Sequence, residues 1–436
     1  MIGATRAGLR LARAGAFALA LLLAPAGGRA ETAAPDYAEL HARMTAAYRA
    51  GDFEAMAGWV RSALSLRPDY PPMLYNQAVA EAQAGRPQDA EALLARLAAM
   101  GLTFPAGEDE DLAPLRGRPG FERSREALAA NSRPAGTARV TFSLEDGHFI
   151  PEGLTFDPQR DAFLLGSVRT GRIARVVGKQ AATLWPPAPE TQGLSAFGMA
   201  MEPGAAHVVV AFNATREHAQ PSARTPQISA IAWIDAEQGA VRAFCVRDES
   251  RHDGVLGDVF VPEAGIAFAA DGIGGAVYRV ERAGCRFTAL VPPGRLVSPQ
   301  GMTASADGSV LYVADYRGGL FSVETESGRL RRMQAPGGTT LYGIDGLVRD
   351  GDWLIGVQNG LRPHRVIALE LTEDGIGELR VLAAALPAFD EPTQGVIARG
   401  RFHFVADSHW GRFDPSGGLP AADLLSGPTV LGLALP

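Results

Sequence analysis

One short pattern recurs six times between residues 150 and 410, and it constrains the fold of this chain more than any other feature. Each copy has a glycine preceded or followed by a residue that is polar in most copies, then an apolar strand, a turn and a second apolar strand. The copies begin at Glu152-Gly153, Phe197-Gly198, Gly257-Asp258, Gln300-Gly301, Asp345-Gly346 and Gln394-Gly395. Periods of about 40–50 residues, with several short strands each, are typical of propeller blades. We therefore predict an all-β, six-bladed propeller over residues 138–436.

The two ends of this region are expected to close the ring. Residues 138–144 alternate as a strand, and we predict that they form the outermost strand of the last blade. Residues 429–435 would be the third strand of the same blade. Closure of this kind hides the free sheet edges that an open array would leave.

A smaller all-α domain is predicted over residues 36–130. Helices are expected at Tyr37–Ala50, Phe53–Leu66, 71–84 and 87–100, with a capping segment at 112–130. Gly51 and Gly85 each close the first helix of a pair and lie 34 residues apart, a spacing that resembles tetratricopeptide repeats. Residues 131–137 would link the two domains.

The first 30 residues have the layout of a secretory signal peptide. Arg6, Arg10 and Arg13 precede an apolar run at 14–24, and small residues follow around Arg29. The run is too short to span a bilayer, so we expect a periplasmic or secreted protein without a transmembrane segment after cleavage. Cleavage of this segment would remove four arginines, and the net charge, which is −7 for the whole chain, would become four units more negative. Such an acidic protein lacks the basic surface that nucleic acid requires.

Cys245 and Cys285 are the two cysteines of the chain. An oxidising compartment would permit a disulfide between them. We expect them, however, on the outer strands of neighbouring blades, too far apart for the close Cα spacing that a bridge needs. The alternative is a pair of half-buried thiols.

The repeats predict where polar side chains gather. Because consecutive strands of a blade are antiparallel, the start of the first and the end of the second lie on one face of the disc. The first set is Glu152, Asp258, Gln300, Asp345 and Gln394, and the second is Ser167, Asn213, Asp271, Asp315, Asn359 and Asp407. Carboxylate and amide oxygens of this kind suit a hard cation such as Ca²⁺.

The two sets are not equivalent. Aspartate at a strand end often bonds its own backbone, so we favour a turn role for Ser167, Asp271 and Asp315. Glu152 and Asp345 stand beside glycines at the inner end of apolar strands. Carboxylates in such a constricted place need a partner, and a cation is the simplest one.

Several loops are expected to leave on the same face. The longest, residues 213–227, is either a lid or a flexible insertion. Arg362, His409 and Trp410 could bind a sugar or an acid, since tryptophan offers a flat apolar platform and arginine pairs with carboxylates. Trp410 could equally be a wedge between blades.

Three segments carry a family resemblance. Residues 151–154, 298–302 with 311–315, and 344–347 resemble the regucalcin/gluconolactonase family of six-bladed propellers. The resemblance implies a divalent cation held by Glu152 in blade one and Asp345 in blade five, with Asp345 also the general base in lactone hydrolysis. Gln300 stands where the family has an asparagine ligand, and Gly257-Asp258 replaces its Asn-Asp in blade three.

These observations leave two hypotheses of different classes. The first is an exported hydrolase of a lactone or related ester, with Ca²⁺, or else Zn²⁺ or Mn²⁺, at Glu152, Gln300 and Asp345. Asp345 would accept the proton of the attacking water and Asp258 would orient a small-molecule substrate. The second is a non-catalytic protein that binds a protein partner through its helical repeats.

Overall fold

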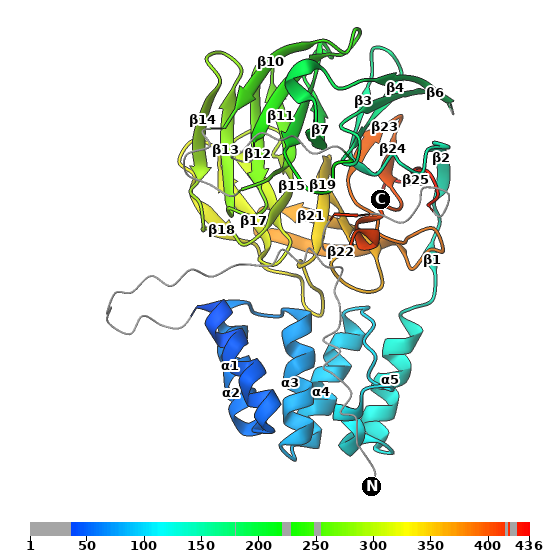
Figure 1. Ribbon diagram of the computed structural model, residues 1–436. Helices are drawn as coiled ribbons and strands as arrows, with labels where there is room; N and C mark the ends of the chain where they lie inside the picture. Colours follow the sequence, from blue (N-terminus) through cyan, green and yellow to red (C-terminus); the bar gives the residue numbers. More distant parts are fainter. Residues whose placement is uncertain (1–35, 179, 220–227, 248–253, 415–416, 419–424) are drawn as a thin grey trace. The chain divides into compact units, whose positions relative to one another are not determined.

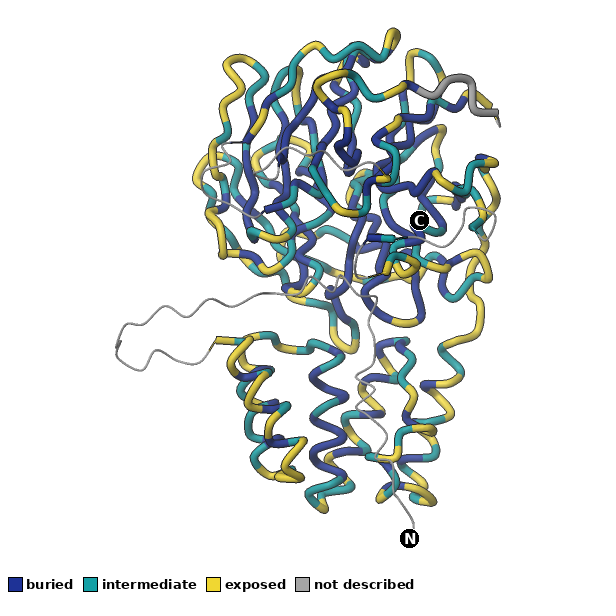
Figure 2. The backbone as a smooth tube through the Cα atoms, viewed as in Figure 1, coloured by how far each residue is buried: buried dark blue, intermediate teal, exposed yellow. Residues whose placement is uncertain are grey.

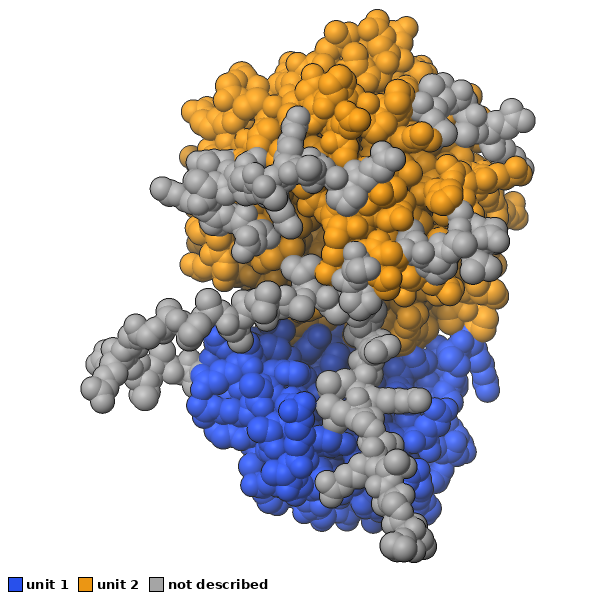
Figure 3. All heavy atoms as spheres, viewed as in Figure 1, with its two compact units in different colours: residues 1–133, 338–340 blue, residues 134–337, 341–436 orange. Residues whose placement is uncertain are grey.

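The computed structural model describes residues 36–178, 180–219, 228–247, 254–414, 417–418 and 425–436, and Figure 1 shows its helices and strands. The predicted leader lies outside these residues. The chain divides into two compact units, one with the helices and one with the strands (Figure 3). Among the described residues, no helix is both long enough and apolar enough to cross a bilayer.

The helical unit is a series of antiparallel helices, each packed on the next. Its elements are α1 (Tyr37–Ala50), α2 (Phe53–Leu66), α3 (Pro71–Gln83), α4 (Pro87–Ala99), the short 3₁₀ helix η1 (Glu110–Leu115) and α5 (Pro119–Ala130). Local chemistry sets their starts: the Asp36 and Asp52 side chains accept backbone N–H bonds at 2.8 and 3.0 Å, and α3 begins at a proline. The predicted helices are therefore present, and their identity as tetratricopeptide repeats stays a prediction.

The strands of the described residues form six sheets, which confirms the predicted six-bladed propeller. Blades one and two are β3 (Pro151–Asp157), β4 (Ala162–Ser167), β5 (Ile173–Val177) and β6 (Gln180–Trp185), then β7 (Ser195–Met201), β8 (His207–Asn213), β9 (Ser229–Asp235) and β10 (Val241–Val246). Blades three and four are β11 (Leu256–Glu263), β12 (Ile266–Asp271), β13 (Ala276–Glu281) and β14 (Arg286–Val291), then β15 (Pro299–Ala304), β16 (Val310–Asp315), β17 (Gly319–Glu324) and β18 (Leu330–Arg332).

Blades five and six contain the two exceptions to a simple four-strand order. Blade five has β19 (Ile344–Asp350), β20 (Trp353–Gln358), β21 (Arg365–Thr372) and β22 (Gly375–Ala384), with β1 (Ala135–Gly136) paired to β22. The segment predicted as a linker thus includes a short strand. Blade six has β23 (Gly395–Ala398), β24 (Arg401–Val405), β25 (Thr429–Ala434) and, outermost, β2 (Arg139–Ser143). This order confirms the predicted closure.

The core lies between the blades, where inner strands are covered on both faces. Every residue of β4 is buried, whereas β14 at a blade edge is largely exposed (Figure 2). Glycine in the repeat permits the close spacing of inner strands: a Cβ atom on Gly153 would lie 2.2 Å from the carbonyl oxygen of Phe197, and one on Gly198 2.6 Å from that of Gly257. The first strand of each blade contacts the first strand of the next, and β23 contacts β3 to complete the ring.

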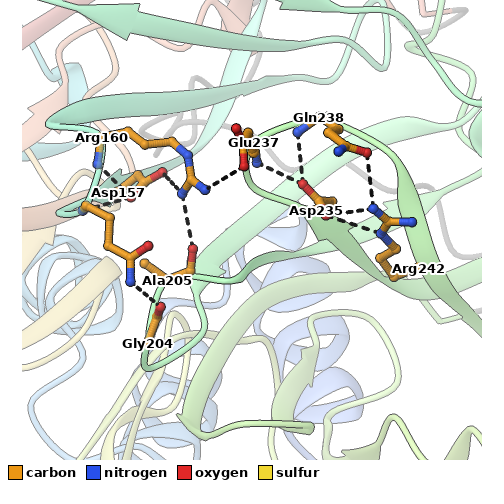
Figure 4. Close-up of polar contacts among 9 residues, drawn as sticks. Asp157, Arg160, Gly204, Ala205, Asp235, Glu237, Gln238 and Arg242 are labelled. Atoms are coloured by element: carbon orange, nitrogen blue, oxygen red, sulfur yellow. Dashed lines mark hydrogen bonds and ion pairs between the residues drawn. The ribbon is translucent and has the colours of Figure 1, made fainter.

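At the ends of the inner strands that lie away from the repeat glycines, the turns of neighbouring blades are hydrogen-bonded to each other. After β3, the guanidinium of Arg160 contacts Asp157 at 2.9 Å and donates to the carbonyl of Ala205 at 3.3 Å, while the Gln159 amide donates to the carbonyl of Gly204 at 2.6 Å (Figure 4). These bonds join the β3–β4 turn of blade one to the β7–β8 turn of blade two. This end of the blades therefore has a structural role.

The cysteines require a correction. Cys245 lies on the outer strand β10, as predicted, but Cys285 lies in the turn between β13 and β14. Their Cα atoms are 4.9 Å apart and the two form a disulfide. The expectation of two separated thiols is wrong, because a turn rather than a strand carries Cys285 against the edge of blade two. The bridge covalently joins blades two and three.

Candidate functional site

In blades one to five, the residue pair that begins each repeat interrupts the pairing of the inner strands. In blade one the register shifts between Pro151 and Leu154, around Glu152-Gly153. Equivalent shifts occur at the predicted repeat starts of blades two to five. Such bulges redirect side chains out of the regular alternation of a strand. The bulges therefore determine the direction of the Glu152, Asp258 and Asp345 side chains, which stand at the start of their strands.

Glu152, Asp258 and Asp345, which we call the carboxylate cluster, come from blades one, three and five. Their exposed fractions are 6%, 3% and 8%. Burial raises the pKa of Glu152 and of Asp258 well above the usual range, and the negative charge of Asp345 raises both further. Burial also raises the pKa of Asp345, to about 7. The three side chains thus lie within electrostatic reach of one another.

The described residues supply no compensating cation for the carboxylate cluster. Within the described ranges, no ion pair to Arg or His is formed by a member of the carboxylate cluster. Its hydrogen bonds come from neutral groups instead. Buried carboxylates without an opposite charge are costly, and the raised pKa values express that cost. The cluster therefore has the chemistry of a cation site.

Trp410 reaches this cluster from blade six. It begins the 3₁₀ turn η3 (Trp410–Arg412), and its indole Nε1 donates to Glu152 Oε2 at 2.6 Å. The ring is tilted beside that of Phe197 in blade two, with centroids 6.0 Å apart. Trp410 therefore joins three blades at the cluster, and the residue is half-buried.

Asn359 is a site residue that the sequence analysis placed only among the strand ends. It follows β20, and its Nδ2 donates to Asp345 Oδ2 at 2.6 Å and to the carbonyl of Pro392 at 2.8 Å. This hydrogen bond opposes the rise of the Asp345 pKa. One signal in the sequence could have identified Asn359. It is an amide at the end of the second strand of its blade, where blades three and four have an aspartate.

Glu391 is a second residue that the sequence analysis missed. It lies outside the repeat pattern, in the segment before β23, and its Oε2 accepts from the backbone N–H of Gly411 at 3.0 Å. Burial raises its pKa, while the charge of Arg362 lowers it. Its own charge raises the pKa values of Glu152 and Asp345. The acidic region thus extends from the cluster toward blade six.

The other predicted site residues are distributed around this region. Arg362 is exposed and lies near Glu391. His409 is buried, with Nδ1 2.9 Å from Asp407 Oδ2 and Nε2 2.9 Å from the carbonyl of Ser426. Burial lowers the pKa of His409, but its bond to Asp407 raises it, and the net change is upward. A substrate would have to displace one of these contacts to reach the imidazole.

Gln300 is directed at blade three. A Cβ atom on Gly257 would lie 3.4 Å from its Oε1, and one on Gly272 would lie 3.3 Å from its Nε2. Its Nε2 is also 3.4 Å from the hydroxyl oxygen of Ser298. The longer glutamine side chain therefore occupies space left by blade-three glycines.

The turn role predicted for three strand ends is confirmed. Ser167 accepts from the backbone N–H of Thr170 at 3.2 Å. Asp271 accepts from the N–H of Gly274 at 2.7 Å, and Asp315 from that of Gly318 at 2.9 Å. Asp271 is also paired with Arg247 at 2.6 Å. These side chains hold loops rather than face a ligand.

The loop predicted as a lid is described only in part, because residues 220–227 lie outside the described ranges. Ser195 and Thr215 share a hydroxyl hydrogen bond of 2.8 Å, and the Arg169 side chain donates to the carbonyl of Glu217 at 2.9 Å. Ala219 N–H in turn donates to the carbonyl of Arg169 at 2.7 Å. The described part is therefore held on the β4–β5 turn of blade one.

The donor set, meaning the carboxylate cluster and Asn359, is chemically suited to a hard divalent cation, although it is not arranged as a ready-made metal site. All its donors are carboxylate or amide oxygens, which calcium-type cations prefer. In the described part of the chain, however, no three His, Cys, Asp or Glu side chains converge as a ready-made metal site. Asp258 Oδ2 and Asn359 Oδ1 are buried and have no hydrogen-bond partner in the described part of the chain. Those two oxygens leave coordination capacity beside Asp345.

Comparisons with known proteins place the chain beside several solved propellers. No family model and no curated protein matches it. A gluconolactonase from Xanthomonas campestris is 17% identical, covering 71% of this chain and 93% of its own, with a TM-score of 0.45. A calcium-binding regucalcin from Agrobacterium tumefaciens is 16% identical, covering 68% and 94%, with a TM-score of 0.47. A PQQ-bound aldose sugar dehydrogenase from Streptomyces coelicolor is 13% identical, covering 69% and 99%, with a TM-score of 0.45.

The chain is thus similar to the regucalcin and gluconolactonase propellers that the sequence analysis named. The six-bladed architecture itself rests on the strand pairing of this protein.

Proposed function

We propose that this protein is an exported, divalent-cation-dependent hydrolase of a lactone or a related ester. The observation that carries the proposal is the carboxylate cluster: Glu152, Asp258 and Asp345 are buried, and none of them forms an ion pair with an opposite charge among the described residues. A divalent cation would compensate that charge. The Cys245–Cys285 disulfide supports export, because disulfides persist in oxidising compartments.

Glu152 and Asp345 are the residues that would hold the cation. When bound, such a cation polarises a substrate carbonyl and stabilises negative charge on its oxygen. Asp345 would be the general base that accepts the proton of the attacking water. Asp258 would orient the substrate through Oδ2, which has no hydrogen-bond partner among the described residues, and the Trp410 and Phe197 rings would provide an apolar wall for it.

The test compares Asp345→Asn with Asp352→Asn, an exposed aspartate of the same blade. Wild-type protein freed of metal by EDTA should gain thermal stability on adding Ca²⁺, Zn²⁺ or Mn²⁺, because a cation that binds only the folded state stabilises it. It should also open sugar lactones in a pH-stat assay. Asp345→Asn should lose both properties and Asp352→Asn should keep both. A wild-type protein that neither responds to cations nor opens any lactone would refute the proposal.

The second candidate function, binding of a protein partner, is favoured by one feature of the helical unit. A cavity of about 570 Å³ lies between α4 and α5 and is lined mainly by small side chains, including Ala92, Ala95, Ala99 and Ala127. An apolar cavity of this kind at the surface of two helices can accept a segment of another protein.

Another side of the same unit is already covered. Tyr75 of α3 stacks on Phe104 at 4.7 Å and donates to Asp109 at 2.7 Å, and Tyr48 of α1 donates to Asp111 at 2.6 Å. The acidic segment 108–111, which runs into η1, therefore contacts α1 and α3, and a partner would not bind there without displacing it.

A further inference from the structure

Two buried oxygen atoms at the carboxylate cluster lack a hydrogen-bond partner within the described residues. They are Asp258 Oδ2 and Asn359 Oδ1, on side chains that are 3% and 5% exposed. Leaving a buried polar atom without a partner costs about 1–3 kcal/mol, so native proteins rarely do so. Such atoms point to a ligand that belongs in the site.

The orientation of the Asn359 amide follows from its neighbours. Its Nδ2 lies 2.6 Å from Asp345 Oδ2 and 2.8 Å from the carbonyl oxygen of Pro392. A backbone carbonyl and an ionised carboxylate can only accept hydrogen bonds, so the NH₂ group must face them. The amide oxygen is consequently the free end of Asn359, and it is buried beside Asp345.

Gln300, the amide expected in the site from the sequence, is directed at blade three, where Gly257 adjoins Asp258. Its Oε1 and Nε2 lie against the positions of Gly257 and Gly272 in blade three. Its Nε2 is 3.4 Å from the Ser298 hydroxyl. The two amides are thus held differently. Among the described residues, Gln300 makes a long hydrogen bond to Ser298, whereas Asn359 is anchored to Asp345 and its amide oxygen has no hydrogen-bond partner.

We propose that Asn359 supplies the amide oxygen ligand of the cation, in the place expected for Gln300. The inference rests on the proposed function, since it needs a cation at Glu152 and Asp345. The Nδ2 bond occupies only one oxygen of Asp345 and leaves the other for the cation. The Asn359 amide would then contribute a neutral oxygen, which adds a ligand without adding charge.

The test measures binding of Ca²⁺ alone to the EDTA-treated, full mature protein by titration calorimetry. Asn359→Leu should weaken binding by about tenfold or more, as expected when a metal site loses such a partner. Gln300→Leu is the matched control, because it removes the other amide, and it should leave the dissociation constant nearly unchanged. Circular dichroism of each variant checks that it is folded.

A second variant separates a ligand from a residue that only positions Asp345. Asn359→Asp keeps an oxygen but cannot donate to Asp345, so a ligand role predicts that it still binds Tb³⁺, whereas a positioning role predicts loss of binding. Tb³⁺ luminescence lifetimes in H₂O and D₂O report the waters bound directly to the ion. Asn359→Leu should show an additional water, and Asn359→Asp should not.

The outcomes distinguish the two proposals. Wild-type protein that binds neither Ca²⁺ nor Tb³⁺ would overturn the proposed function and this inference with it. Wild-type binding that is weakened by Gln300→Leu and unaffected by Asn359→Leu would overturn this inference alone. Loss of Tb³⁺ binding in folded Asn359→Asp would do the same.

Discussion

At the scale of single residues, the chemistry of this protein is concentrated in carboxylates that are more buried than ionised groups normally are. Asp345 is 8% exposed, and its hydrogen bond from Asn359 only partly offsets the burial that raises its pKa to about 7. A group whose pKa is raised in this way has either a proton or a cation as its stable partner. Which partner it has should depend on pH and on added metal.

This dependence gives a prediction for stability. In metal-free protein the folded state binds more protons than the unfolded state between pH 4 and about 7, because folding raises the Asp345 pKa. The free energy of unfolding should therefore fall as pH rises through that window, by up to about 1.4 kcal/mol per pH unit from this group. Asp345→Asn should flatten the profile, as measured by urea unfolding with EDTA at several pH values. Parallel profiles for wild type and Asp345→Asn would contradict this account.

At the scale of elements, adjacent blades are held by specific contacts in addition to their apolar packing. The disulfide joins β10 of blade two to the β13–β14 turn of blade three, and it closes a segment with a sequence separation of 40 residues. Blades one and two are joined by Arg160 and Gln159, which lie in the β3–β4 turn of blade one and bond the β7–β8 turn of blade two (Figure 4). Each contact restrains one blade against the next.

Removing the disulfide should therefore destabilise the propeller. For a closed segment of this length, chain entropy predicts a loss of about 4 kcal/mol in the double variant Cys245→Ser/Cys285→Ser. Urea unfolding of the variant, compared with wild type before and after reduction, measures the effect. The oxidised wild type should show no free thiol when denatured, and a reactive thiol there would show that the bridge does not form.

At the scale of the whole molecule, the propeller is closed by a strand from the start of its own sequence. β2 pairs with β25 as the outermost strand of blade six, and Phe142 on β2 is 1% exposed. This arrangement joins the two ends of the repeat region and leaves no gap between the last blade and the first. The stability of the ring should depend on β2 more than on the helical unit.

Two shortened chains test this dependence. A chain of residues 134–436 keeps β1 and β2 and should fold into a soluble, cooperatively unfolding propeller without the helices. A chain of residues 144–436 lacks both strands and should aggregate, since burial of Phe142 alone is worth about 3–5 kcal/mol and β25 would have an open edge. Soluble yield and thermal unfolding compare the two. Equal stability of both chains would show that β2 is dispensable.

The features predicted correctly are those governed by local pattern. The helix starts depend on Asp36, Asp52 and proline within one turn, and the blade count depends on a repeat that is visible along the chain. The features missed depend on distances between blades. Cys285 was expected on a strand and lies in a turn, and Glu391 belongs to no repeat and reaches the acidic region only through the fold.

The amino-acid sequence by itself therefore determined the architecture, because alternating strands, turn glycines and helix caps act on near neighbours. It also singled out Glu152 and Asp345 by their place beside inner-strand glycines. Only the tertiary structure decided that Asn359 contacts Asp345, that Gln300 lies against blade three and that Trp410 bonds Glu152. These contacts join residues from different elements, and their geometry is set by how inner strands pack around the ring rather than by spacing along the chain.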